Sequence, residues 1–169
     1  RAAAATVFAG KQVAFVAPTT VLVRQHLRTL IRRFAGTGIA VAELSRMVKP
    51  ADARAVKEGL KSGAVRIVVG THAVAAKDVG FADLGLVVLD EEQHFGARVK
   101  SRLKSLAETA HVLTLTATPI PRTLQASLVG LQDLSVIETP PVARQSVRTA
   151  VAAFDEAAVQ SALRREKLR

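Results

Sequence analysis

The sequence predicts an α/β fold in which one parallel β-sheet is sandwiched between helices, giving three layers. The chain has 169 residues, of which 49% are hydrophobic, and this is enough for the core of one ordinary domain. Short apolar runs alternate along the chain with longer amphipathic segments, an alternation that is typical of parallel sheets with helices on both faces. Polar residues directly follow several of the apolar runs, and parallel α/β folds bind ligands at the carboxyl ends of their strands.

Five apolar runs have the length and the β-branched composition of buried parallel strands. They occupy residues 12–17, 39–44, 65–71, 84–90 and 111–118, and a sixth run at 133–139 predicts an edge strand. Four of the runs end in polar clusters, which are Thr19–Thr20, Gly70–Thr71–His72, Asp90–Glu91 and Thr116–Thr118. Four strand ends therefore indicate independently a binding site along one edge of the sheet.

Helices are predicted in the segments between the apolar runs. They are the opening RAAAATVFAG, residues 20–35, residues 51–63 with Gly63 as a C-terminal stop, residues 97–108, and a helix begun by Pro119 and Pro121. The helix at 20–35 is amphipathic, with arginines on one face and an apolar stripe on the other formed by Leu27, Leu30, Ile31 and Phe34. Thr20 fits the N-cap position of this helix.

The composition favours contact with a polyanion and a reducing environment. The net charge is +10, which a basic nucleic-acid-binding surface and a solvated arginine-rich surface explain about equally well. The chain has no Tyr or Trp, so nucleic acid would be held through its phosphates rather than by base stacking. Cysteine is absent, no signal peptide is visible, and no apolar run approaches the ~18 residues of a membrane span. We therefore expect a cytoplasmic protein with no membrane contact.

The stretch VVLDEEQHF (residues 87–95) places carboxylates at the end of a buried strand. Buried carboxylates are costly unless a partner offsets their charge, and Mg²⁺ binds one or two carboxylates together with phosphate oxygens and water. In this Walker B interpretation Asp90 holds Mg²⁺ through water and Glu91 is the general base that polarises the attacking water. The alternative is that both residues begin a helix, where carboxylates offset the helix dipole.

The stretch TLTATPIPRT (residues 114–123) supports the Walker B interpretation, because a hydroxyl-rich loop beside the carboxylates could sense a γ-phosphate. Together, DEEQHF and TATPIPRT resemble motifs II and III of superfamily 2 helicases and translocases. PTTVLVRQH (residues 18–26) resembles motif Ia, and GTHAV (residues 70–74) resembles motif Ib. The resemblance covers residues 12–169 and implies a RecA-like fold.

Two branches of this superfamily share TATPIPRT: the transcription-repair coupling factors and the RecG-like branched-DNA helicases. The DEEQ form, GARVKSRLKSL and GLQDLSVIETPPVARQSVRT (residues 130–149) resemble the coupling factors. That family implies an ATP-driven translocase on double-stranded DNA that displaces stalled RNA polymerase and recruits excision-repair proteins. A RecG-like helicase and a non-catalytic nucleic-acid-binding module remain as alternatives.

The resemblance also implies the domain organisation. Residues 1–139 would form the first RecA-like motor domain, residues 140–149 a linker, and residues 150–169 the truncated start of a second motor domain. The family's phosphate loop, G-x-x-x-x-G-K-[ST], is not present in the chain, and Gly10-Lys11 does not match it because Gln12 follows. Since this loop supplies most of the grip on the phosphates, we expect the segment alone to bind ATP weakly and to hydrolyse none.

The roles of individual residues are carried over from the family's motifs. Asp90 would be the Mg²⁺ partner and Glu91 the base, while Gln93 and His94 would link the nucleotide to motif III. Thr116 and Thr118 would couple the nucleotide state to the grip on DNA. A third set would face the DNA backbone, whose phosphates suit hydroxyls and backbone amides at helix starts: Thr19, Thr20, Arg24, Gly70, Thr71 and His72.

Overall fold

The computed structural model of the chain describes residues 1–106, 108–117, 135–137, 139, 149, 151 and 153–167. The chain divides into two units, Arg1–Ile120 and Pro121–Arg169. The first unit carries the sheet, and each unit is described by itself.

The first unit contains a five-stranded parallel sheet, as the sequence predicts. Its strands are β1 (Gln12–Val16), β2 (Val41–Leu44), β3 (Ile67–Gly70), β4 (Leu84–Asp90) and β5 (His111–Leu115). Their order across the sheet is β2-β3-β1-β4-β5, and every pair of neighbours is parallel. Strands β1, β3 and β4 are almost wholly buried, which explains why their sequences are continuous apolar runs rather than alternating ones.

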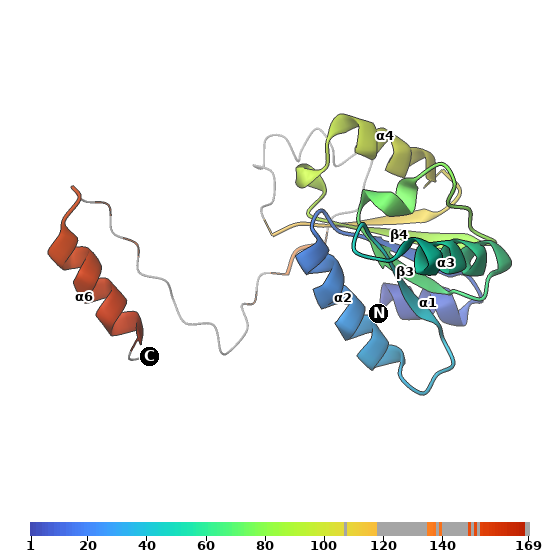
Figure 1. Cartoon of the computed structure of the whole chain (residues 1–169), viewed down its shortest axis with the longest axis horizontal. Helices are drawn as coiled ribbons and strands as arrows, with labels where there is room; N and C mark the ends of the chain where they lie inside the picture. Colours follow the sequence, from blue (N-terminus) through green and yellow to red (C-terminus); the bar gives the residue numbers. More distant parts are fainter. Residues whose placement is uncertain are drawn as a thin grey trace. The chain divides into compact units, whose positions relative to one another are not determined.

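Helices cover both faces of this sheet, so the predicted three-layer arrangement is confirmed (Figure 1). On one face, α1 (Ala2–Phe8) and α2 (Thr20–Phe34) pack through residues such as Val7, Val23 and Phe34. On the other face, α3 (Pro50–Ser62) and α4 (Ala97–Leu106) pack through Leu60 and Leu103. Two short 3₁₀ helices, η1 (His72–Ala75) and η2 (Glu92–His94), follow β3 and β4 directly.

The ends of the helices agree with the sequence signals except at the start of α2. Gly63 ends α3 in the left-handed conformation at φ 80°, as expected for a glycine C-cap. The N-cap of α2 is Thr19, whose hydroxyl accepts a hydrogen bond from the Leu22 N–H at 3.3 Å. The prediction of Thr20 as the cap was wrong, because Thr19 has the extended backbone that a cap requires and Thr20 is already helical.

The apolar stripe of α2 is narrower than predicted. Phe34 is buried, and Leu27 and Leu30 pack against the sheet. Ile31 is 50% exposed and is not among the α2 residues that pack in this cluster.

The amino ends of the strands are held by one buried side chain. Gln12 is fully buried, and its amide donates to the carbonyls of Leu60 and Val65 at 2.9 Å and 2.8 Å. Its side-chain oxygen accepts from the Asp83 N–H at 2.9 Å, and Lys11 forms an ion pair with Asp83 at 3.1 Å. Gly10 and Lys11 thus lie at the start of β1, at the end of the sheet opposite to Asp90, and have a structural role there.

An ion pair ties α3 to the loop that follows η1. Lys57 Nζ lies 2.5 Å from Asp78 Oδ2, and this hydrogen bond holds the pKa of the Asp78 carboxyl below its usual value. Both partners are at the surface, where such pairs contribute little to stability.

In the second unit the described residues include one helix, α6 (Glu156–Lys167). The edge strand predicted at 133–139 was wrong for the residues that are described, since 135–137 and 139 have no strand conformation. Pro119, Pro121 and most of the predicted linker at 140–149 lie outside the described residues. None of the described helices is long and apolar enough to cross a membrane.

Candidate functional site

The carboxyl ends of four strands lie level at one edge of the sheet. Val16 of β1 is in register with Gly70 of β3 and Leu89 of β4, and Asp90 is in register with Leu115 of β5. The polar clusters that follow these strands therefore occur on neighbouring loops, as the sequence predicts. The first turn of α2 also begins at this edge.

Asp90, the last residue of β4, is anchored by a histidine of α2. The Nε2 atom of His26 lies 2.6 Å from Asp90 Oδ2, so the ring donates this hydrogen bond when the carboxylate is ionised. The side chains of the pair are only 24% and 15% exposed. The ring of His26 also packs on Phe15 of β1, with the ring centroids 4.4 Å apart. This contact was not predicted from the sequence.

Glu91 adopts a backbone conformation that is unusual for a residue with a side chain. Its φ of 51° and ψ of 49° are left-handed, and strain of this kind persists where the surrounding structure holds the residue in place. The Glu91 N–H donates to the carbonyl of Leu115 at 2.9 Å. Its carboxylate accepts from the Ala117 N–H at 3.2 Å and from the amide of Gln93. The Glu91 carboxylate is thus bonded to the backbone that follows β5.

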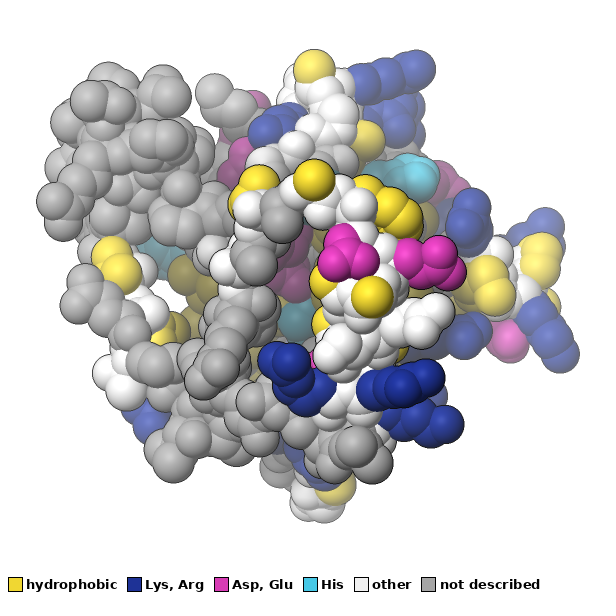
Figure 2. Space-filling model, turned by 90° about the vertical axis from the view of Figure 1, so that its left-hand side faces the viewer, with side chains coloured by type: hydrophobic (Ala, Val, Ile, Leu, Met, Phe, Trp, Pro, Cys, Tyr) yellow, Lys and Arg dark blue, Asp and Glu magenta, His cyan; other side chains and the backbone are white. Residues whose placement is uncertain are grey.

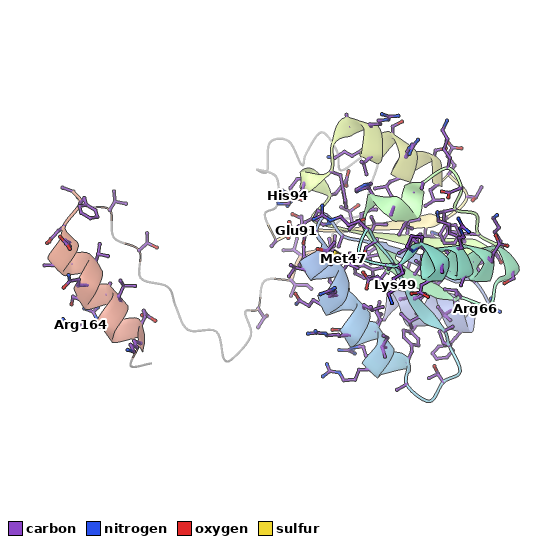
Figure 3. The ribbon with its side chains drawn as sticks, viewed as in Figure 1. Met47, Lys49, Arg66, Glu91, His94 and Arg164 are labelled. Atoms are coloured by element: carbon purple, nitrogen blue, oxygen red, sulfur yellow. The ribbon has the colours of Figure 1, made fainter. Side chains whose placement is uncertain are left out.

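Gln93 and His94 lie in η2, immediately after the carboxylates. The His94 N–H donates to the Glu91 carbonyl at 2.9 Å, and the side chains of Gln93 and His94 are exposed. Figure 3 shows Glu91 and His94 close together at the end of the sheet where α2 begins. The structure therefore brings Asp90, Glu91, Gln93 and His94 together in one corner.

The corner suits a magnesium ion that is held largely by a nucleotide. No group of three or more acidic, histidine or cysteine side chains that could hold a metal occurs among the described residues. Asp90 offers one partly exposed carboxylate, with one oxygen engaged by His26. Mg²⁺ typically binds one or two carboxylates and takes its remaining ligands from phosphate and water, and this donor set fits that mode.

The structure describes only one of the two threonines that were predicted in motif III. Thr116 follows β5 and is exposed, one residue before the amide that binds Glu91. Thr118 lies outside the described residues.

The six residues predicted to face the DNA backbone divide into exposed and buried groups. Thr19, Arg24 and His72 are exposed, and Thr20 is partly exposed. Gly70 and Thr71 are buried, Thr71 at 6% exposure. At Gly70, a Cβ atom would lie 2.1 Å from the carbonyl oxygen of Leu44, so this glycine permits close packing of the β2 and β3 ends.

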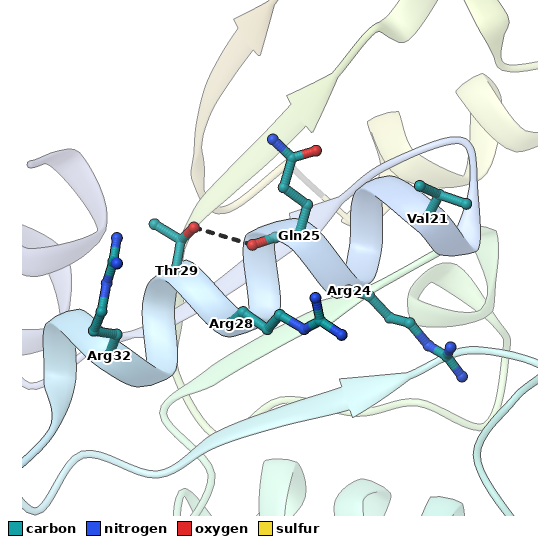
Figure 4. A pocket seen from close by; sticks show the side chains of 6 residues that line it. All are labelled: Val21, Arg24, Gln25, Arg28, Thr29 and Arg32. Atoms are coloured by element: carbon teal, nitrogen blue, oxygen red, sulfur yellow. Dashed lines mark hydrogen bonds between the residues drawn. The ribbon is translucent and has the colours of Figure 1, made fainter.

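Arginines of α2 line a shallow hollow on the surface of the first unit (Figure 4). Its volume is about 640 Å³. The described residues that line it lie on successive turns of α2: Val21, Arg24, Gln25, Arg28, Thr29 and Arg32. Thr29 donates its hydroxyl to the Gln25 carbonyl at 3.0 Å, and α2 contains no acidic residue.

Arg28 and Arg32 were not among the predicted site residues, although a signal was present. Arg24, Arg28 and Arg32 recur every four residues, a spacing that places them on neighbouring turns of one helix, about 6 Å apart along the axis. On the face drawn in Figure 2, basic side chains occur at several separate places. The arginine row of α2 belongs to the helix that begins at the strand-end corner and contacts it through His26.

The chain was compared with protein-family models, with curated proteins and with solved structures. Residues 2–127 match the family model described as DEAD/DEAH box helicase. The chain is 51% identical over 98% of its length to transcription-repair-coupling factors of Staphylococcus aureus (strain USA300) and Staphylococcus haemolyticus (strain JCSC1435). It covers only 14% of those relatives.

Two solved structures resemble the chain. A structure of RecG bound to a three-way DNA junction matches 94% of this chain and 21% of that chain, with a TM-score of 0.73 and 34% sequence identity. The C-terminal part of the Fun30 ATPase domain matches 71% of this chain and 40% of that chain, with a TM-score of 0.51 and 12% identity. The second likeness is one of fold alone.

Proposed function

Since this chain belongs to the DEAD/DEAH box helicase family, we propose that it forms part of the ATP-driven motor of a double-stranded DNA translocase. The 51% identity to transcription-repair-coupling factors over almost the whole chain supports a protein of that kind. In this proposal the complete protein displaces stalled RNA polymerase and recruits excision-repair proteins in the cytoplasm, through regions outside this chain. The chain spans about a seventh of those relatives, so only the motor is argued from its residues.

The observation that carries the proposal is the corner formed by Asp90 and Glu91. Magnesium-bound ATP would supply the phosphoryl group and the free energy. Asp90 would hold the ion through water, with its carboxylate orientation fixed by His26. Glu91 would accept a proton from the attacking water at its carboxylate.

Motif III would sense the same carboxylate through its backbone. The Ala117 N–H donates to Glu91, so a change at this carboxylate would shift the loop after β5. Thr116, in the same loop, and Thr118 would pass that shift to the grip on DNA. Gln93 and His94 would complete the connection, with the Gln93 amide already bonded to Glu91.

The DNA backbone would lie along the exposed start of α2. Thr19, Thr20 and Arg24 would bind phosphates, together with His72 and the backbone at Gly70 and Thr71. Arg28 and Arg32 would extend this contact along the hollow. Such contacts read no base sequence, as a translocase that moves along any DNA requires.

A RecG-like branched-DNA helicase is the second candidate. It is favoured by one observation, the 34% identity and TM-score of 0.73 to RecG on a three-way DNA junction. The motor chemistry would be the same in both cases, and the two candidates differ in the nucleic-acid structure on which the complete protein acts.

The test uses the full-length protein that contains this segment and its Glu91→Gln variant. RNA polymerase is stalled on a DNA template, and its release is followed after ATP is added. We expect release by the wild type and a loss of ATP hydrolysis by about 100-fold or more in Glu91→Gln, because a general base contributes about 10²–10⁴-fold.

The matched control is Glu58→Gln, which makes the same change at an exposed carboxylate of α3 paired with Lys61. It should release RNA polymerase like the wild type. Remodelling of branched DNA without release of RNA polymerase would move the assignment to the RecG-like helicase. Full hydrolysis by Glu91→Gln would remove Glu91 from the role of base.

A further inference from the structure

The contact between His26 and Asp90 joins two parts of the fold that are distant in sequence. His26 lies in the second turn of α2, on the helix that carries the exposed Arg24, Arg28 and Arg32. Asp90 is the last residue of β4. The 2.6 Å separation of Nε2 and Oδ2 makes this a direct hydrogen bond, and charge-assisted bonds of this kind are short and strong.

The imidazole ring is itself held in place. It packs on Phe15 with a centroid distance of 4.4 Å and an interplanar angle of 38°, and its side chain is only 24% exposed. Phe15 belongs to β1, which is paired with β4. The ring thus stands between two neighbouring strands and α2, and it has little freedom to turn away from Asp90.

A hydrogen bond to one oxygen restricts the whole carboxylate. The last torsion of an aspartate side chain is broad when nothing holds it, so an unbound carboxylate would sample many orientations. With Oδ2 bonded to His26, the direction of Oδ1 is fixed by the planar geometry of the group. Among the described residues, His26 is the one partner that the structure gives to the Asp90 carboxylate.

We propose that His26 is a positioning residue for magnesium-nucleotide binding, which acts by holding the Asp90 carboxylate in the orientation that receives the hydrated ion. The proposal rests on the function proposed above, in which Asp90 is the magnesium partner. Groups that hydrogen-bond to metal-ligating side chains orient them, and their loss typically lowers metal affinity about 10–100-fold. Because Asp90 would act through water, we expect an effect near the lower end of that range.

The test separates the hydrogen bond from the packing of the ring. His26→Phe keeps an aromatic ring against Phe15 but removes the donor. His26→Gln restores a donor, because its amide nitrogen reaches about as far from the backbone as the imidazole Nε2. His111→Phe is the matched control, since His111 is an exposed histidine at the start of β5, at the opposite end of the sheet.

The measurement is equilibrium binding of a fluorescent ADP analogue to the full-length protein, with and without Mg²⁺. For each variant, the dissociation constant without Mg²⁺ is divided by the dissociation constant with Mg²⁺. This ratio gives the contribution of the ion to binding. We expect His26→Phe to reduce this ratio about tenfold while binding without Mg²⁺ stays unchanged. His26→Gln should recover most of the ratio, and His111→Phe should match the wild type.

Two results would overturn the inference while leaving the proposed function intact. One is a His26→Phe ratio equal to that of the wild type. The other is an equal loss of affinity with and without Mg²⁺, which would show that His26 only supports the fold. If the wild type itself gained nothing from Mg²⁺, the assignment of Asp90 would fail, and the inference would fail with it.

Discussion

At the scale of single residues, the strand-end corner is defined by backbone geometry as much as by side-chain chemistry. Glu91 is the one described non-glycine residue with a positive φ, at 51°, and four hydrogen bonds to neighbouring groups hold it there. Gly70 is required for another reason, which is the close approach of the β2 backbone. Both constraints act at strand ends, beside the loops that would bind nucleotide and DNA.

Gly70→Ala should destabilise the protein by about 1–3 kcal/mol or more, the usual cost of overpacking a core. A Cβ atom here would lie 2.1 Å from the Leu44 carbonyl oxygen and 2.5 Å from Val74 Cγ2, and the carbonyl is backbone of a strand paired with β3. The free energy of unfolding from denaturant titration measures the loss.

Gly96→Ala is the control for this substitution. A Cβ at Gly96 would meet no atom within 4 Å, and its φ is not positive, so its stability should equal or slightly exceed that of the wild type. Equal stability of Gly70→Ala and Gly96→Ala would contradict the packing argument.

At the scale of elements, α2 connects the two functions that the fold is proposed to combine. Its buried residues pack on the sheet, His26 reaches Asp90, and its arginines line the exposed hollow. One helix of 15 residues therefore presents one side to Asp90 and another to solvent.

Replacing Arg28 and Arg32 together by alanine should weaken the binding of the full-length protein to duplex DNA at every sequence tested. Each lost phosphate contact lowers the salt dependence, so the slope of log K against log salt concentration should fall in magnitude by about 2. Fluorescence anisotropy over a series of salt concentrations gives both quantities.

The matched control replaces Arg33 and Arg54, two exposed arginines that are not among the residues lining the hollow. The net charge changes equally in both double variants. If the control lowered the slope as much as Arg28→Ala/Arg32→Ala, a general charge effect would account for the binding and the hollow would have no special role.

At the scale of the whole molecule, the described unit would supply part of a nucleotide site in the proposed function. In the proposed function the corner would offer one carboxylate for magnesium and one base, and no G-x-x-x-x-G-K-[ST] sequence occurs in the chain. Phosphate binding in such motors comes mainly from that loop, so in the proposed function the corner would take part in hydrolysis but would hold the phosphates only weakly.

The 169-residue segment alone should therefore bind ATP weakly and show no turnover, whereas the full-length protein should hydrolyse ATP. Isothermal titration with ATP and Mg²⁺, followed by a phosphate-release assay, tests the segment directly. Micromolar affinity together with turnover by the segment would show that its own residues suffice.

Most of the fold could be predicted from the sequence because the elements of the sheet have strong local signals. The runs at β1, β3 and β4 are apolar on both faces, which only a strand buried between two layers of helices tolerates. Gly63 predicted the end of α3 to within a residue. The amphipathic pattern of α2 predicted the ends of that helix to within a residue or two and the face that packs on the sheet. The predicted strand at 133–139 failed over the described residues, because a short apolar run by itself does not determine a partner for pairing.

The sequence by itself determined the layered α/β architecture, the strand ends that carry polar residues, and the motifs around Asp90 and Glu91, because these depend on local composition and order along the chain. Only the tertiary structure decided that His26 binds Asp90, that Gly70 packs on Leu44, and that Ala117 binds Glu91. These contacts depend on which strands become neighbours. The order β2-β3-β1-β4-β5 arises from packing of the whole sheet, and no local pattern in the chain encodes it.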